Sequence, residues 1–223
     1  IRRETGLALE IIQPEEEARL AVISCAPLVS TRTEQLLVVD IGGGSTELVW
    51  IDLTAVPRRE RPRAIMRLHA GFRQDAGPFP VAQVVDWISV PLGVATLRDQ
   101  FEDVEDDAAR FALMSWSFEE NLAGFAPSGA AQAREGFQII GTSGTVTTVA
   151  ASHLGLKRYD RAKVDGLRMT SDQIDAVIRA YLQMGPEGRR ADPRIGRDRH
   201  HLIMSGAAIL QALMRLWPTD RLS

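Results

Sequence analysis

A run of glycines between two apolar segments has the clearest chemical meaning in this sequence. In residues 36–50, a β-branched apolar stretch ends at Asp40, three glycines follow at 42–44, and a second apolar stretch begins after Ser45. This pattern predicts a strand, a tight turn and a second strand. Glycines let adjacent backbone amides point at one place, and such a group of amides binds anions. An ordinary glycine-rich hairpin is the alternative, but we predict phosphate binding by Gly42, Gly43, Gly44 and Ser45.

Two carboxylates flank this turn. Asp40 precedes it, and Glu47 follows Ser45 by two positions. Because side chains alternate along a strand, Ser45 and Glu47 are expected on one face and Thr46 and Leu48 on the other. Carboxylate oxygens suit Mg²⁺, directly or through water. The sequence therefore predicts Mg²⁺ as the cofactor, with Asp40 and Glu47 as its ligands.

Two common nucleotide motifs do not fit. The dinucleotide fingerprint requires a third glycine where Glu47 stands and then a helix, whereas an apolar strand pattern follows here. The Walker A motif requires Gly-Lys-Ser or Gly-Lys-Thr, and neither tripeptide occurs. Both interpretations are excluded.

A second glycine loop lies a hundred residues later. The sequence 138–151, Gln-Ile-Ile-Gly-Thr-Ser-Gly-Thr-Val-Thr-Thr-Val-Ala-Ala, predicts a short strand, a loop of small residues and a helix. Free amides at the positive end of a helix bind phosphate, although such loops also serve only as helix caps. Since a first glycine loop is already present, we predict phosphate binding by Gly141, Ser143, Gly144 and Thr145.

These segments together carry a resemblance to a known family. Asp-Ile-Gly-Gly-Gly-Ser-Thr-Glu-Leu-Val at 40–49, Glu-Glu-Glu-Ala-Arg-Leu at 15–20 and Gly-Thr-Ser-Gly-Thr at 141–145 are similar to the exopolyphosphatase and guanosine pentaphosphate phosphohydrolase (Ppx/GppA) family. Ser-Gly-Ala-Ala-Ile-Leu at 205–210 fits as well. The resemblance implies an α/β, actin-like (ribonuclease H-like) fold with a mixed β-sheet flanked by helices. It also implies a phosphoanhydride hydrolase that releases terminal phosphate.

The resemblance assigns a role to Glu17. Pro14 and the three glutamates after it predict a helix to about Ser24, and a helix dipole alone explains Glu15 and Glu16. Glu17 precedes Leu20 and Ala21 by three and four residues, so we predict that it faces inward. Its match to the family glutamate before Ala-Arg implies the base that activates water. With Glu47, it completes the predicted catalytic pair.

The resemblance also predicts the domain organisation. Relatives open with Asp-x-Gly-Ser-Asn-Ser followed by an arginine, and no such segment occurs here. Residues 1–13 are therefore expected to be a remnant of a first actin-like domain, with a strand at Leu7–Ile12. Residues 14–223 are expected to form the second domain, with helix 14–24 at the cleft between the domains. The full-length form is expected to be a homodimer.

Several functions stay open at this stage. The resemblance covers polyphosphate and guanosine penta- or tetraphosphate as binding partners and does not separate them. A sugar or acetate kinase of the same superfamily would share the loops, but the glutamate-rich helix argues against it. A regulator that binds guanosine tetraphosphate without hydrolysis would not need Glu17 and Glu47. A filament protein of the actin type would polymerise.

Composition narrows these classes further. The net charge of −3 argues against a nucleic-acid partner, and no apolar run is long enough for a membrane span, so a cytoplasmic protein is expected. The single cysteine, Cys25, is predicted to be buried. Twenty-four of the 26 basic residues are arginines, and they form clusters at 58–67 and 189–199 that could bind a polyanion or be ordinary solvated loop charge.

The remaining elements follow from periodicity and turn residues. A strand is predicted at 64–69, and glycine- and proline-rich loops are predicted at 71–80 and 185–198. Helices are predicted at 92–101, 108–124, 146–154, 171–184 and 200–217.

Overall fold

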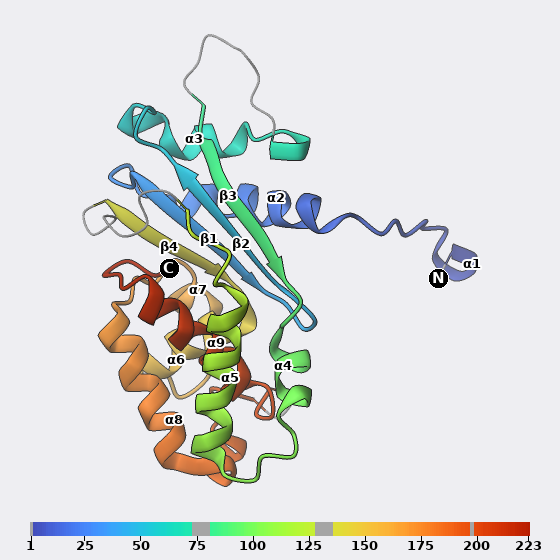
Figure 1. Cartoon of the computed structure of the whole chain (residues 1–223), viewed down its shortest axis with the longest axis vertical. Helices are drawn as coiled ribbons and strands as arrows, with labels where there is room; N and C mark the ends of the chain where they lie inside the picture. Colours follow the sequence, from blue (N-terminus) through green and yellow to red (C-terminus); the bar gives the residue numbers. More distant parts are fainter. Residues whose placement is uncertain (1, 73–80, 128–135, 197–198) are drawn as a thin grey trace.

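A computed structural model describes residues 2–72, 81–127, 136–196 and 199–223. A four-stranded mixed sheet in the order β3-β2-β1-β4 lies between two layers of helices (Figure 1). This is the predicted α/β fold.

The strands are β1 (Gln35–Ile41), β2 (Thr46–Asp52), β3 (Gln83–Val90) and β4 (Phe137–Thr142). The helices are α1 (Arg2–Thr5), α2 (Pro14–Ser24), α3 (Arg61–Met66), α4 (Val94–Gln100), α5 (Asp107–Asn121), α6 (Gly144–His153), α7 (Arg161–Val164), α8 (Ser171–Ala191) and α9 (Ile203–Leu216), with short 3₁₀ turns at Ala26–Leu28, Arg58–Glu60 and Ala70–Phe72.

The strand directions bring the two glycine loops to one edge of the sheet. β1 and β2 form the predicted antiparallel hairpin around residues 42–45, with Ile41 opposite Thr46. β4 runs parallel to β1, with Asp40 beside Thr142. Parallel neighbours end at the same edge, so the loop after β1 and the loop after β4 are neighbours.

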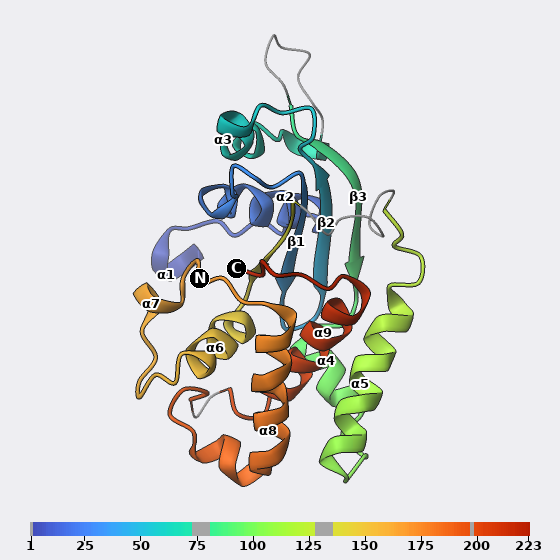
Figure 2. The same cartoon turned by 90° about the vertical axis from the view of Figure 1, so that its left-hand side faces the viewer.

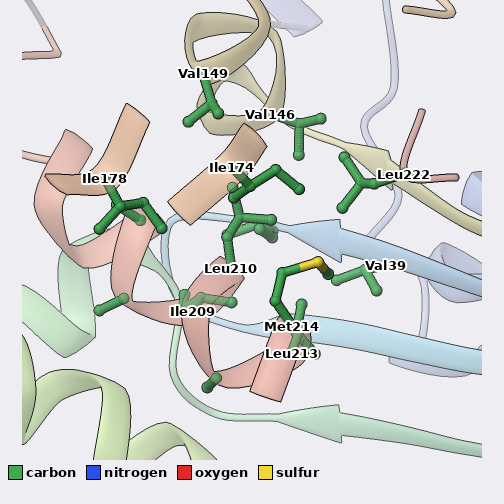
Figure 3. Packing of buried hydrophobic residues seen from close by; sticks show 14 of the residues in the cluster. Val39, Val146, Val149, Ile174, Ile178, Ile209, Leu210, Leu213, Met214 and Leu222 are labelled. Carbon is green, nitrogen blue, oxygen red and sulfur yellow. The ribbon is translucent and has the colours of Figure 1, made fainter. Parts of the chain in front are cut away.

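Each face of the sheet has its own hydrophobic core. Leu37, Val39 and Trp50 belong to the core that also contains residues of α5, α6, α8 and α9. Figure 2 shows these helices on one side of the sheet, and Figure 3 shows Val39 beside Met214 of α9. On the other face, Val38 and Val49 pack with residues of α2 and α3. Alternation along β1 and β2 therefore places Asp40 and Glu47 on the α2 face. None of the helices in the described ranges is long and apolar enough to cross a membrane.

The segment before α2 differs from the prediction. Residues 6–13 form no strand, and they pair with no strand within the described ranges. Leu9 and Ile11 are 72% and 99% exposed, since no neighbouring strand covers them. The predicted strand at Leu7–Ile12 is wrong for this chain, whereas α2 begins at Pro14 and ends at Ser24 as predicted.

Three other predictions are corrected. The expected strand at 64–69 is mostly helix α3, because Pro62 starts a helix and Ala64, Ile65 and Leu68 are buried at helical spacing. Strand β3 was not predicted. In α8, Gly185 takes a left-handed φ of 65° and a helical segment continues to Ala191, so part of the predicted loop 185–198 is helical. The predicted loop 71–80 lies largely outside the described residues.

Candidate functional site

The first glycine turn is held by its carbonyl groups. The amides of Val94 and Ala95, at the start of α4, donate to the carbonyl oxygens of Gly42 and Gly43 at 2.9 Å each. These amides would otherwise be unsatisfied at a helix N-terminus, so the turn caps α4. The amides of Gly43 and Gly44 donate to no group in the described ranges. The turn therefore presents its donors, and not its acceptors, for a ligand.

Close packing requires glycine at position 93. A Cβ there would lie 2.5 Å from both the oxygen of Gly42 and the carbonyl carbon of Gly43. By contrast, a Cβ on Gly43 or Gly44 would meet no atom within 4 Å, and neither has a positive φ. Folding alone does not demand glycine at 43 or 44. The open space above these two residues fits a ligand that approaches the backbone closely.

The second glycine loop starts α6. Ser143 caps the helix, because its Oγ accepts from the amides of Thr145 and Val146 at 3.1 and 3.2 Å. Gly141 serves packing, since a Cβ would lie 2.7 Å from Val146 Cγ2, and its amide already donates to the Ser223 carbonyl at 2.8 Å. The phosphate roles predicted for Gly141 and Ser143 stay predictions, with both groups engaged in this structure.

The two loops meet at one cavity. Gly42 and Gly43 line it from one side and Gly144 and Thr145 from the other, around a volume of about 180 Å³. This confirms that the predicted phosphate-binding segments converge. Arg199 also lines the cavity, with its Nη1 3.5 Å from the Gly144 carbonyl oxygen. Sequence reasoning placed Arg199 only in a general basic cluster, because its position depends on how α9 packs against α6.

Four polar side chains form a row across the sheet near the edge where the glycine loops lie. The strand register places Thr142, Asp40, Glu47 and Ser89 next to one another on successive strands. Glu47 is 3% exposed, and Ser89 Oγ donates to its Oε1 at 2.8 Å. Burial raises the pKa of Asp40; the hydroxyl of Thr142 opposes this rise, and the charge of Glu47 adds to it. A buried carboxylate whose pKa is raised in part by a neighbouring carboxylate is an environment that a cation would stabilise.

The two carboxylates fit the predicted Mg²⁺ site in part. No group of three or more acidic, histidine or cysteine side chains that could hold a metal occurs in the described part of the chain. Mg²⁺ commonly uses one or two carboxylates and completes its shell with water and substrate phosphates. Asp40 and Glu47, on strands that end at the glycine loops, match that donor set.

The raised pKa of Asp40 predicts a pH-dependent stability effect. Asp40 binds its proton more tightly in the folded protein than in the unfolded chain. The folded state therefore loses stability as the pH rises from the unfolded pKa of Asp40 through its folded pKa. Without Mg²⁺, Asp40→Asn should therefore raise Tm relative to the parent at neutral pH, with a gap that narrows towards about pH 4.

Asp52 provides the control for this measurement. Its burial would raise the pKa, but hydrogen bonds from Thr54 outweigh that effect and the net pKa is lowered. Asp52→Asn should therefore become more destabilising as pH rises. Thermal unfolding of both variants across this pH range tests the sign, and parallel curves for the two variants would contradict the assignment.

Glu17 does not face inward as predicted. The buried stripe of α2 consists of Ala18, Val22 and the adjacent Cys25, whereas Glu17 is exposed and Leu20 is 46% exposed. The prediction assumed that Leu20 is a core residue. That assumption placed Glu17 on the buried face of α2, which in fact contains Ala18 and Val22. Burial raises the pKa of the Cys25 thiol to about 12, in line with its predicted role as a small buried hydrophobe. The catalytic role of Glu17 stays a prediction.

Two arginines of the predicted clusters serve the fold itself. Arg61 is buried and donates to the carbonyls of Val56 and Thr31. Arg189 is buried against Asp107, with its Nη2 at 2.6 Å from Oδ1. Arg197 lies outside the described residues. Neither cluster as a whole forms a free cationic surface.

The mixed four-stranded sheet flanked by helices, with two glycine loops around one cavity, has the actin-like α/β fold. The profile of the Ppx/GppA phosphatase family matches residues 1–223. The chain belongs to this family.

Solved structures agree with this assignment. The Aquifex aeolicus PPX-GPPA enzyme is 25% identical, with a TM-score of 0.71 over 100% of this chain and 64% of that one. An exopolyphosphatase-like protein is 30% identical, with a TM-score of 0.72 over 96% of this chain and 61% of that one. A Cytophaga hutchinsonii exopolyphosphatase, 18% identical, shares the fold with a TM-score of 0.71 over 99% and 62%. The chain spans less than two thirds of each of these structures.

Proposed function

We propose that this chain is part of a phosphoanhydride hydrolase that releases terminal phosphate from inorganic polyphosphate or guanosine pentaphosphate. The observation that carries the proposal is the convergence of the two glycine loops on one cavity, at the sheet edge where Asp40 and Glu47 pair on adjacent strands. The family assignment supports a phosphatase. Both substrates present a terminal phosphoryl group on an anhydride, so one site can act on either.

We assign the following roles in phosphate release to residues of this chain. The free amides of Gly43 and Gly44 would hold one phosphate, and the start of α6 with Arg199 would hold its neighbour. Asp40 and Glu47 would hold Mg²⁺, which supplies charge neutralisation on the phosphate oxygens. Glu17 would accept the proton of the attacking water. Catalysis then rests on positioning and electrostatics, as in other phosphoryl transfers.

Phosphate release by the full-length protein tests the proposal directly. Long-chain polyphosphate and guanosine pentaphosphate would each be incubated with the protein at varied Mg²⁺, and free phosphate measured over time. Release from at least one substrate is the expected result. Binding without any release would instead indicate a sensor, and transfer of phosphate to a sugar or acetate would indicate a kinase.

Glu47→Gln should weaken the dependence on Mg²⁺. Glutamine keeps an acceptor for Ser89 Oγ but removes the negative charge from a buried position. We expect the Mg²⁺ concentration for half-maximal release to rise and turnover to fall, because a hard cation loses an anionic ligand. Glu120→Gln, at an exposed position of α5, is the matched control. A Mg²⁺ titration that coincides with that of the parent would remove Glu47 from the metal site.

A further inference from the structure

Two further clefts lie next to the cavity between the glycine loops. Gly144 and Arg199 line both that cavity and a cleft of about 650 Å³ next to it. Tyr159 and Arg161 line this second cleft and also a third one of about 640 Å³. The shared residues show that the three spaces adjoin. A ligand too long for the 180 Å³ cavity would extend towards these neighbouring clefts.

The third cleft is basic. Lys157, Arg158 and Lys163 line the third cleft, and these are the only two lysines of the chain together with a neighbouring arginine. Lys163 pairs with Asp160 at 3.6 Å. No ion pair joins Lys157, Arg158 or Arg161 to any residue in the described ranges.

Lys157, Arg158 and Arg161 differ in this respect from the cluster arginines that serve the fold. The buried arginines at 61 and 189 bond to backbone carbonyls and carboxylates, and Arg194 is held by Asp192. Lys157, Arg158 and Arg161 have no ion pair within the described ranges and line an open space. Exposed cations that the fold does not use for itself are available to bind anions.

We propose that Arg199, Arg161 and Lys157 form an anion track for the internal phosphates of a long inorganic polyphosphate. The terminal phosphates occupy the glycine loops, and the rest of the chain leaves past Arg199 towards residues 157–163. This inference rests on the proposed function and adds a preference for chain length. Several weak contacts along one polymer add to its affinity, whereas a short anion ends before it reaches them.

Tyr159 and Asp165 supply the competing interpretation. Tyr159 is 39% exposed, and its ring could stack on a nucleoside base, while the Asp165 carboxylate also lines the second cleft. In the second cleft the single Asp165 carboxylate lies with two cations, Arg161 and Arg199. The third cleft contributes two more cations, Lys157 and Arg158. The balance of charge favours a linear polyanion over a base.

The test is the double variant Lys157→Gln, Arg161→Gln in the full-length protein. Kd would be measured for polyphosphate of several hundred units and for tripolyphosphate. We expect binding of the long polymer to weaken by about fivefold to tenfold, as two exposed ion pairs allow, and its salt dependence to become shallower. Tripolyphosphate should change by less than about twofold, because it does not extend to these cations. The double variant Arg32→Gln, Arg179→Gln removes two exposed charges that line none of these clefts and should leave both values unchanged.

Three outcomes would overturn the track. Equal losses for both chain lengths, or no loss for either, would show that residues 157 and 161 do not contact internal phosphates. A loss confined to guanosine tetraphosphate would make the cleft a nucleoside site. An RNA homopolymer bound as tightly as polyphosphate, and weakened equally, would make it a general polyanion surface. Because Kd is measured without turnover, failure of phosphate release would count against the proposed function alone.

Discussion

Replacement of Glu17 by glutamine is expected to lower kcat for phosphate release by about 10²-fold or more, with little change in KM. Glutamine keeps the size and hydrogen-bonding capacity of the side chain but cannot accept a proton from water. The exposed position of Glu17 on α2 makes a structural role for its side chain unnecessary, so the variant should fold normally. Steady-state phosphate release by the full-length protein measures this effect.

The control for Glu17 lies in the same turn of the helix. Glu15→Gln removes one negative charge from the start of α2 and should retain nearly full activity, because it alters only the interaction with the helix dipole. If the two variants lose activity to the same small extent, Glu17 is a dipole residue like its neighbour. The base must then be sought elsewhere.

Gly93→Ala is expected to lower kcat/KM by about 10²-fold, because a shift of about 1 Å in a positioning group costs that much. The new Cβ would overlap the backbone of Gly42 and Gly43 at about 2.5 Å, so the glycine turn or the start of α4 must move. The same strain should destabilise the fold by about 1–3 kcal/mol. Phosphate release and thermal unfolding together measure both effects.

Gly124→Ala is the matched control for Gly93. A Cβ at position 124 would meet no atom within 4 Å, and this glycine has no positive φ. Its activity should equal that of the parent. Assays well below the Tm of Gly93→Ala separate displacement of the turn from partial unfolding. A folded Gly93→Ala protein with parental kcat/KM would show that the turn is not part of the reactive site.

Local sequence patterns predicted the parts of the site that depend on adjacent residues. The hairpin around residues 42–45 and the loop before α6 follow from glycines next to apolar runs. We predicted that the two loops converge because two loops that bind one ligand must lie together. The parallel pairing of β1 with β4 is the physical cause, since it places both loops at the same edge of the sheet.

Contacts between distant segments could not be predicted in this way. Gly93 is essential for packing only because α4 starts against the carbonyls of a turn fifty residues earlier. The arginines at 61 and 199 look alike in sequence, yet Arg61 is buried and bonds to backbone carbonyls, whereas Arg199 lines the cavity between the glycine loops. Whether the Glu17 side chain faces the core or the solvent depends on which face of α2 packs against the sheet, and the sequence of the helix alone did not decide this.

The capping of α4 by the glycine turn has a consequence for how the site responds to acidity. A peptide amide has no proton that dissociates in the range where proteins are folded, unlike a histidine or lysine that binds phosphate. Because α4 occupies the carbonyls and leaves the amides of Gly43 and Gly44 as the donors, the proposed phosphate affinity of this turn should not change with pH. Any pH profile of phosphate binding should therefore report the ionisation of the phosphate itself and of Asp40, and not of the loop.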